Sequence, residues 1–175
     1  MRIPQIIILC INCLFVSCGT SVVPPTDYEM IQHFHAHEPA FNQIKELISV
    51  CPNNSYYPPY HPNDTICLIG IPIPIQKELD SLLVEIGGKR IFYTVETERQ
   101  EYQKVTPNVE LCIQYFVSGY SVGGTMKEFV YSTKVEKRFP IENRELNHIY
   151  QKRYNDTILY KSIKKNWFIR LIHDN

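Results

Sequence analysis

A serine-hydrolase pattern, G-x-S-x-G, occurs at Gly119-Tyr120-Ser121-Val122-Gly123. Asp156 and His173 follow it in the chain order of an α/β-hydrolase triad. The motif works where a strand turns tightly into a helix, so that the serine stands above its base. Here the residues after Gly124 alternate in polarity as a strand does, and the glycines suit a hairpin turn. We therefore expect no catalysis at Ser121, and hydrolysis stays only as an alternative.

Three histidines lie close together in His33-Phe34-His35-Ala36-His37. On a helix His33 and His37 share a face, whereas on a strand all three do. Neutral imidazoles at such spacing can bind zinc or copper, with Glu38 or His61 as a further ligand. No downstream residue completes a diagnostic spacing, so we expect solvated or capping histidines and neither a metal nor another cofactor.

Tyrosines and prolines dominate the segment between Cys51 and Cys67. Tyr56, Tyr57 and Tyr60 could form a stiff, amphipathic surface of the kind used in contacts between proteins. The alternative is that these rings pack onto the edge of the fold. We take the three tyrosines as the candidate surface for a protein partner.

The first seventeen residues have the order of a secretory signal peptide, with Arg2, an apolar stretch over 3–16 and the small Ser17. The apolar stretch is shorter than the roughly 20 residues that a membrane-spanning helix needs. An ordinary signal peptide, cleaved near Gly19 or Thr20, is one interpretation.

The second interpretation rests on Leu14-Phe15-Val16-Ser17-Cys18, which resembles the lipobox of bacterial lipoproteins. The resemblance implies cleavage before Cys18 and acylation of its thiol with fatty acids such as palmitate. Because Gly19 is not an aspartate, it also implies delivery to the outer membrane, facing the periplasm, rather than retention in the inner membrane. Residues 18–26 then form a tether, since Pro24 and Pro25 cannot continue a helix.

Cys51, Cys67 and Cys112 remain after cleavage if Cys18 is acylated. An exported compartment permits disulfides, and a Cys51–Cys67 bridge would contribute about 3 kcal/mol in the chain-entropy model. Cys112 lies in an apolar strand pattern and is expected to be a buried thiol. We therefore predict that Cys51 pairs with Cys67. These three cysteines contain no C-x-x-C pair, so we do not expect them to bind a metal.

Residues 27–175 read as one α+β domain, with N-terminal helices packed on an antiparallel sheet of about five strands. Apolar spacing predicts a helical lead from Asp27, a helix over 40–50 and another over 76–86 that Gly87-Gly88 ends. Polarity then alternates with a period of two, which predicts strands. The expected strands are 89–95, 109–120, 125–133, 156–162 and 167–173, with some helix over 141–150.

The net charge is zero, but it is unevenly distributed. Residues 27–110 hold 12 acidic and 6 basic residues, and residues 127–170 hold 5 acidic and 11 basic ones. The halves either neutralise each other within the fold or leave a basic face for an acidic partner, such as lipid headgroups. We expect a non-enzymatic lipoprotein that meets the membrane through its anchor and binds no nucleic acid. Its domain would bind an unknown protein or serve the envelope structurally, and an inhibitor or immunity protein is the alternative.

Overall fold

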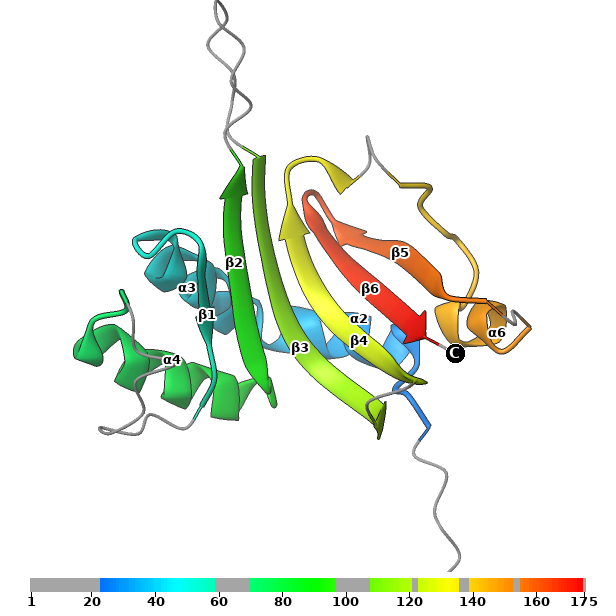
Figure 1. Cartoon of the computed structure of the whole chain (residues 1–175), viewed down its shortest axis with the longest axis horizontal. Coiled ribbons are helices and arrows are strands. Elements are labelled where there is room, and N and C mark those ends of the chain that lie inside the picture. Colours follow the sequence, from blue (N-terminus) through cyan, green and yellow to red (C-terminus); the bar gives the residue numbers. More distant parts are fainter. Residues whose placement is uncertain are drawn as a thin grey trace, which may run out of the picture.

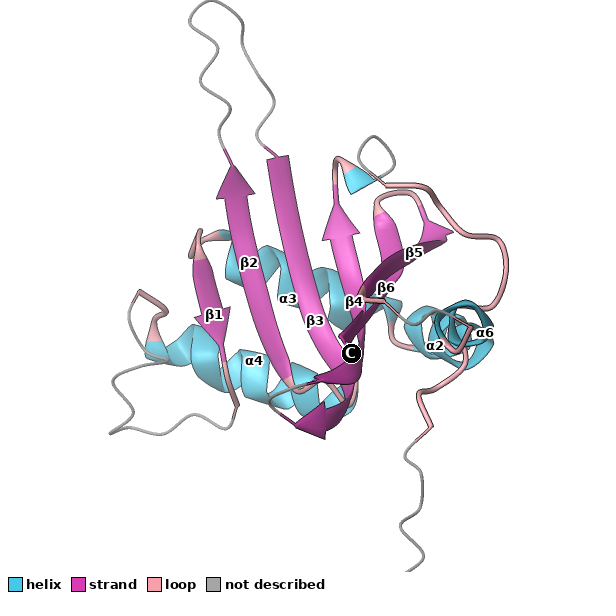
Figure 2. Ribbon diagram, turned by 45° about the vertical axis from the view of Figure 1, so that its right-hand side comes forward, coloured by secondary structure: helices cyan, strands magenta, loops and turns pink. Residues whose placement is uncertain are grey.

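The computed structural model places helices against one face of a single antiparallel sheet (Figures 1 and 2). The described residues are 23–58, 70–96, 108–120, 123–135, 139–152 and 155–174. The expected α+β class is confirmed. The sheet has six strands rather than about five, and the helices are not clearly N-terminal, since one follows the first strand and another lies between the fourth and fifth strands.

The first two helices are α2 (Asp27–Ala36) and α3 (Glu38–Ser49), which agree with the predicted lead and helix. α2 begins with a capping box, in which the Thr26 hydroxyl accepts from the Glu29 N–H and the Glu29 carboxylate accepts from the Thr26 N–H. α3 begins two residues before the predicted start, because Pro39 falls in the first turn, where no N–H donor is needed.

The third helix, α4 (Ile73–Glu85), begins three residues before the predicted Gln76. Pro72 occupies the N-cap position and Pro74 lies in the first turn, where its missing N–H is not needed. Gly87 has a φ of +63°, and the Gly88 N–H donates to the Leu83 carbonyl at 2.8 Å. The glycine pair therefore ends α4, as predicted.

The sheet has the strand order β1-β2-β3-β4-β6-β5. Its strands are β1 (Asn54–Tyr56), β2 (Arg90–Glu96), β3 (Asn108–Tyr120), β4 (Gly123–Ser132), β5 (Thr157–Lys164) and β6 (Trp167–Asp174). The last five match the predicted strands, whereas β1 lies in the tyrosine- and proline-rich segment, where no strand was predicted. The predicted helix over 141–150 is confined to α6 (Leu146–Tyr150), between β4 and β5.

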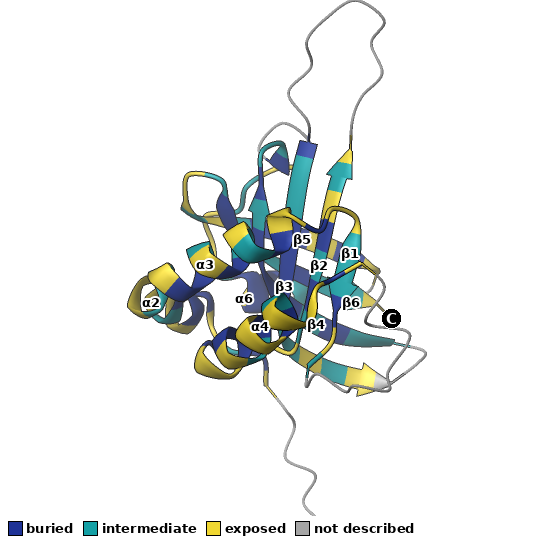
Figure 3. Ribbon diagram, turned by 90° about the vertical axis from the view of Figure 1, so that its left-hand side faces the viewer, coloured by how far each residue is buried: buried dark blue, intermediate teal, exposed yellow. Residues whose placement is uncertain are grey.

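The main core fills the space between α2, α3, α4 and the sheet, where buried positions of the two layers face each other (Figure 3). We call this side of the sheet the inner face. Its centre is an aromatic cluster in which the Phe41 ring lies 4.9 Å from Phe34, 4.7 Å from Phe129 and 5.8 Å from Trp167. The cluster joins α2 and α3 to β4 and β6.

The opposite side of the sheet, the outer face, has a smaller core. Val135, with the half-buried Ile141, packs over the side chains of Cys112, Val130 and Phe168. The chain that follows β4 therefore covers part of the outer face.

Candidate functional site

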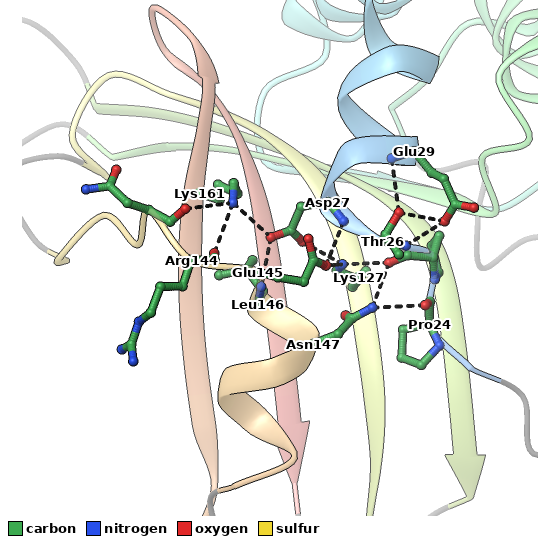
Figure 4. A network of polar contacts seen from close by, with 12 residues as sticks. Pro24, Thr26, Asp27, Glu29, Lys127, Arg144, Glu145, Leu146, Asn147 and Lys161 are labelled. Atoms are coloured by element: carbon green, nitrogen blue, oxygen red, sulfur yellow. Dashed lines mark hydrogen bonds and ion pairs between the residues drawn. The ribbon is translucent and has the colours of Figure 1, made fainter.

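A buried network of charges joins the start of α2 to β4, β5 and α6 (Figure 4). The side chains of Lys127 and Asp27 are 0% and 1% exposed, and Lys127 Nζ lies 2.7 Å from Asp27 Oδ1. The other Asp27 oxygen accepts from the Leu146 N–H at 2.8 Å and lies 3.4 Å from Lys161 Nζ. The buried carboxylate is thus paired and hydrogen-bonded on both oxygens.

The same network holds the chain where it enters the domain. Lys127 Nζ donates to the Pro25 carbonyl at 2.7 Å, and Asn147 Nδ2 donates to the Pro24 carbonyl at 3.0 Å. Glu145 accepts from the Asp27 N–H at 2.8 Å. We call the side chains that hold this segment the N-terminal clamp, namely Asp27, Lys127, Glu145, Asn147 and Lys161.

The sequence reasoning identified none of the five clamp residues, and Lys127 is the most buried of their charged groups. Burial lowers the pKa of Lys127, and the hydrogen bond and charge of Asp27 act in the opposite direction. Along β4, side chains alternate between the two faces, so Lys127 lies on the inner face between the buried Thr125 and Phe129. That alternation was the available signal, because it places a lysine among buried residues.

On the outer face, six polar side chains lie in one line across the sheet, from β5 to the residue after β1. Paired positions on neighbouring strands, and a hydrogen bond between Arg90 and Tyr57, bring them together. We call this line the polar row, which consists of Tyr57, Arg90, Gln114, Glu128, Arg170 and Tyr160.

Arg170 of the polar row pairs with two carboxylates, one inside the row and one beside it. Its Nη2 lies 2.5 Å from Glu128 Oε2, and its Nη1 lies 2.9 Å from Glu110 Oε1. Nη2 also contacts the Cys112 sulfur at 3.0 Å. Burial nevertheless raises the pKa of the Cys112 thiol well above its ordinary value, although Arg170 opposes the shift. The thiol is therefore protonated at neutral pH and is a structural group rather than a nucleophile.

Next to the polar row, the outer face has a shallow groove of about 570 Å³ that is open to solvent. Arg90 lines one side of it, and Asp174 lines it from β6. Its apolar lining comes from Val117, Met126 and Ile172. We call this feature the outer groove.

The three candidate histidines do not converge. The His33 and His37 rings are tilted by 33° with centroids 4.3 Å apart, and His33 Nε2 lies 2.9 Å from the Ile86 carbonyl oxygen. His35 Nδ1 instead lies 3.9 Å from Glu38 Oε2. Among the described residues, no three His, Cys, Asp or Glu side chains gather as metal ligands.

The candidate tyrosine surface needs correction. Tyr56 is fully buried, and its hydroxyl donates to the Gln76 carbonyl at 3.0 Å, so it cannot contact a partner. Tyr57 is 38% exposed, and its hydroxyl accepts from Arg90 at 3.3 Å. Tyr60 lies outside the described residues. Tyr57 therefore belongs with the polar row rather than with a separate tyrosine loop.

Several predicted residues lie outside the described ranges: the signal segment 1–17, Cys18, His61, Cys67 and Ser121. Cys51 and Cys112 are buried, with no disulfide between described cysteines. The Cys51–Cys67 bridge therefore stays a prediction.

The acidic and basic halves of the chain pair with each other across the fold. Four ion pairs join them, namely Asp27–Lys127, Asp27–Lys161, Glu38–Lys164 and Glu110–Arg170. Much of the uneven charge is thus used within the domain, as in the first of the two alternatives.

In the part of the chain that the structure describes, no helix is both long and apolar enough to cross a membrane. No curated protein and no solved structure shows significant similarity to the chain. A family model matches over residues 23–73 and 66–175 and is described as a domain of unknown function, DUF4948. These two stretches cover the whole domain, and the chain therefore belongs to the DUF4948 family.

Proposed function

We propose that this chain is a non-enzymatic lipoprotein of the bacterial envelope, anchored through Cys18, whose periplasmic domain binds another protein. The observation that supports it best is the N-terminal clamp, which grips the carbonyls of Pro24 and Pro25. Only five residues separate Cys18 from Pro24, and five or six extended residues span about 20 Å at most. An acylated Cys18 would thus hold the domain against the membrane surface.

The clamp gives such an anchor a fixed attachment point on the domain. Buried side chains hold the chain at Pro24 and Pro25, so only the five residues after Cys18 separate the anchor from this fixed point. One acyl chain binds a membrane only weakly, so the lipobox resemblance, which implies more than one, is needed for stable anchoring.

Fractionation of cells that express the chain tests the anchor. Globomycin, or Cys18→Ala, should move the protein from the membrane fraction to a precursor or soluble form. Ser17→Ala keeps a small residue before the cysteine and is the matched control, which should stay in the membrane fraction. Unchanged fractionation of Cys18→Ala would remove the anchor from the proposal.

The outer face supports protein binding, because the Arg90 guanidinium lies over the exposed Tyr57 ring beside the outer groove. An inhibitor or immunity protein against an envelope toxin would use the same kind of surface. A neighbouring toxin gene, or one dominant partner whose capture Tyr57→Ala prevents, would favour that alternative. The enzyme alternatives are tested by metal analysis of a His35→Ala variant and by fluorophosphonate labelling of Ser121, and we expect neither a metal nor a label.

A further inference from the structure

The two sides of the polar row differ in what covers them. On one side, Val135 and Ile141 cover Cys112, Val130 and Phe168. On the other side, the described residues leave an apolar strip open to solvent, with Val117 38% exposed and Ile158 53% exposed. Met126 and Ile172 lie between these two positions in the sheet register. The outer groove therefore lies in the half of the outer face that the described chain does not cover.

The two arginines of the polar row also differ in their partners. Arg170 pairs with the carboxylates of both Glu110 and Glu128. Arg90 has no carboxylate partner among the described residues, and its Nε is buried without a hydrogen bond. Its guanidinium lies 4.1 Å from the Phe92 ring centroid and 5.3 Å from that of Tyr57. Two aromatic rings thus hold in place a charged group for which the described residues supply no anion.

We propose that the outer groove binds a segment of another protein that brings a carboxylate to Arg90 and an apolar side chain to Val117, Met126 and Ile172. Charge complementarity places the carboxylate at Arg90, because Asp174 lines the groove from β6 and would repel it there. This inference rests on the proposed protein-binding function and specifies the chemistry of the partner.

A protein segment fits the groove better than a free small molecule does. Small-molecule sites enclose most of their ligand, whereas this groove is shallow and open. Arginine and tyrosine are the residue types that dominate binding energy between proteins, and Arg90 and Tyr57 meet at the side of the groove. Between them, Arg90 and the apolar strip offer one charged and one apolar contact.

Two of the three methionines provide a direct assay. Met126 lines the outer groove, whereas Met30 is fully buried in the main core and serves as an internal control. The mature protein is labelled with ¹³C at the methionine methyl groups and titrated with N-acetylleucine or with N-acetylleucinamide. N-acetylleucine should shift the Met126 signal with a millimolar dissociation constant, as expected for so small a fragment, and leave Met30 unchanged.

The amide probe lacks the negative charge and should bind about fivefold more weakly, as expected for a partly exposed ion pair. Arg90→Gln should abolish this difference between the probes, while Lys89→Gln, which removes a neighbouring positive charge, should preserve it. An unchanged Met30 signal shows that the Arg90→Gln variant is folded.

Several outcomes would overturn the inference. Equal binding of both probes to the wild type, no shift of Met126, or a difference that survives Arg90→Gln would each remove Arg90 as a carboxylate site. Saturation at micromolar N-acetylleucine would indicate a small-molecule site instead of a protein-docking surface. These outcomes are separate from the fractionation of Cys18→Ala, which tests the anchor, and from partner capture, which tests protein binding as such.

Discussion

Replacing Lys127 by methionine tests whether the N-terminal clamp stabilises the whole domain. The change removes the ammonium 2.7 Å from Asp27 and leaves a carboxylate that is 1% exposed. Breaking a buried ion pair from one side costs about 3 to 5 kcal/mol. Asp27 keeps the Leu146 N–H and the nearby Lys161, so we expect the lower end of that range. For a domain of this size, about 3 kcal/mol lowers the melting temperature by roughly 6 to 12 °C.

Urea unfolding of the purified protein, followed by circular dichroism, measures the free energy of unfolding. Lys165→Met is the matched control, because Lys165 is exposed in the turn between β5 and β6, and we expect a change within about 0.5 kcal/mol. In the double variant Asp27→Asn/Lys127→Met the pair becomes neutral, so it should be more stable than Lys127→Met alone. A cost below about 1 kcal/mol for Lys127→Met, or a double variant less stable than the single one, would refute this account of the clamp.

Three further predictions concern other parts of the domain. Burial lowers the pKa of His33 below 6.5, so the unfolded chain binds more protons and His33 contributes stability above pH 6.5 that is lost as the pH falls. His33→Gln should therefore make the urea midpoint fall less steeply on acidification. An unchanged slope would contradict this prediction. Gly119→Ala should destabilise the domain more than Gly87→Ala. Both glycines have a positive φ, but an added Cβ at Gly119 would also lie 2.4 Å from the Gly123 carbonyl oxygen. A lower melting temperature for Gly87→Ala than for Gly119→Ala in differential scanning calorimetry would refute this. Cys112 should react with iodoacetamide only after unfolding, because it is buried and its pKa is raised. Labelling of Cys112 in the folded protein would contradict its burial. Mass mapping without reductant in the same experiment shows whether Cys51 is joined to Cys67.

Local sequence patterns predicted most of the fold because each long element has its own periodicity. The alternation over Thr125–Thr133 predicted β4, and Leu79, Leu82 and Leu83 predicted the buried side of α4. β1 was missed because three residues are too few to show an alternation, and only its pairing with β2 defines it. The predicted helix over 141–150 was too long, since only the five residues of α6 are helical.

The candidate sites were harder to predict because they depend on strand register rather than on neighbouring residues. Each member of the polar row lies on a different strand or segment, and only the alignment of strands brings them together. The tyrosine pattern singled out Tyr56 and Tyr57 alike and could not separate the exposed Tyr57 from the buried Tyr56, although adjacent residues in an extended chain face opposite ways.

The clamp also links the attachment of the chain to the completion of folding. Its contacts join Asp27 to Lys127 and Leu146, and Pro24 to Asn147, across 100 to 123 positions of sequence. Such contacts form only after β4 and α6 have reached their places, since contacts this distant in sequence incur a loop-closure entropy that local ones avoid. The segment at Pro24 and Pro25 is therefore fixed only when the domain is complete. If Cys18 is acylated, only a fully folded copy has this fixed attachment, and the outer groove then has a fixed position relative to Pro24 and Pro25 because the clamp and the groove share β4.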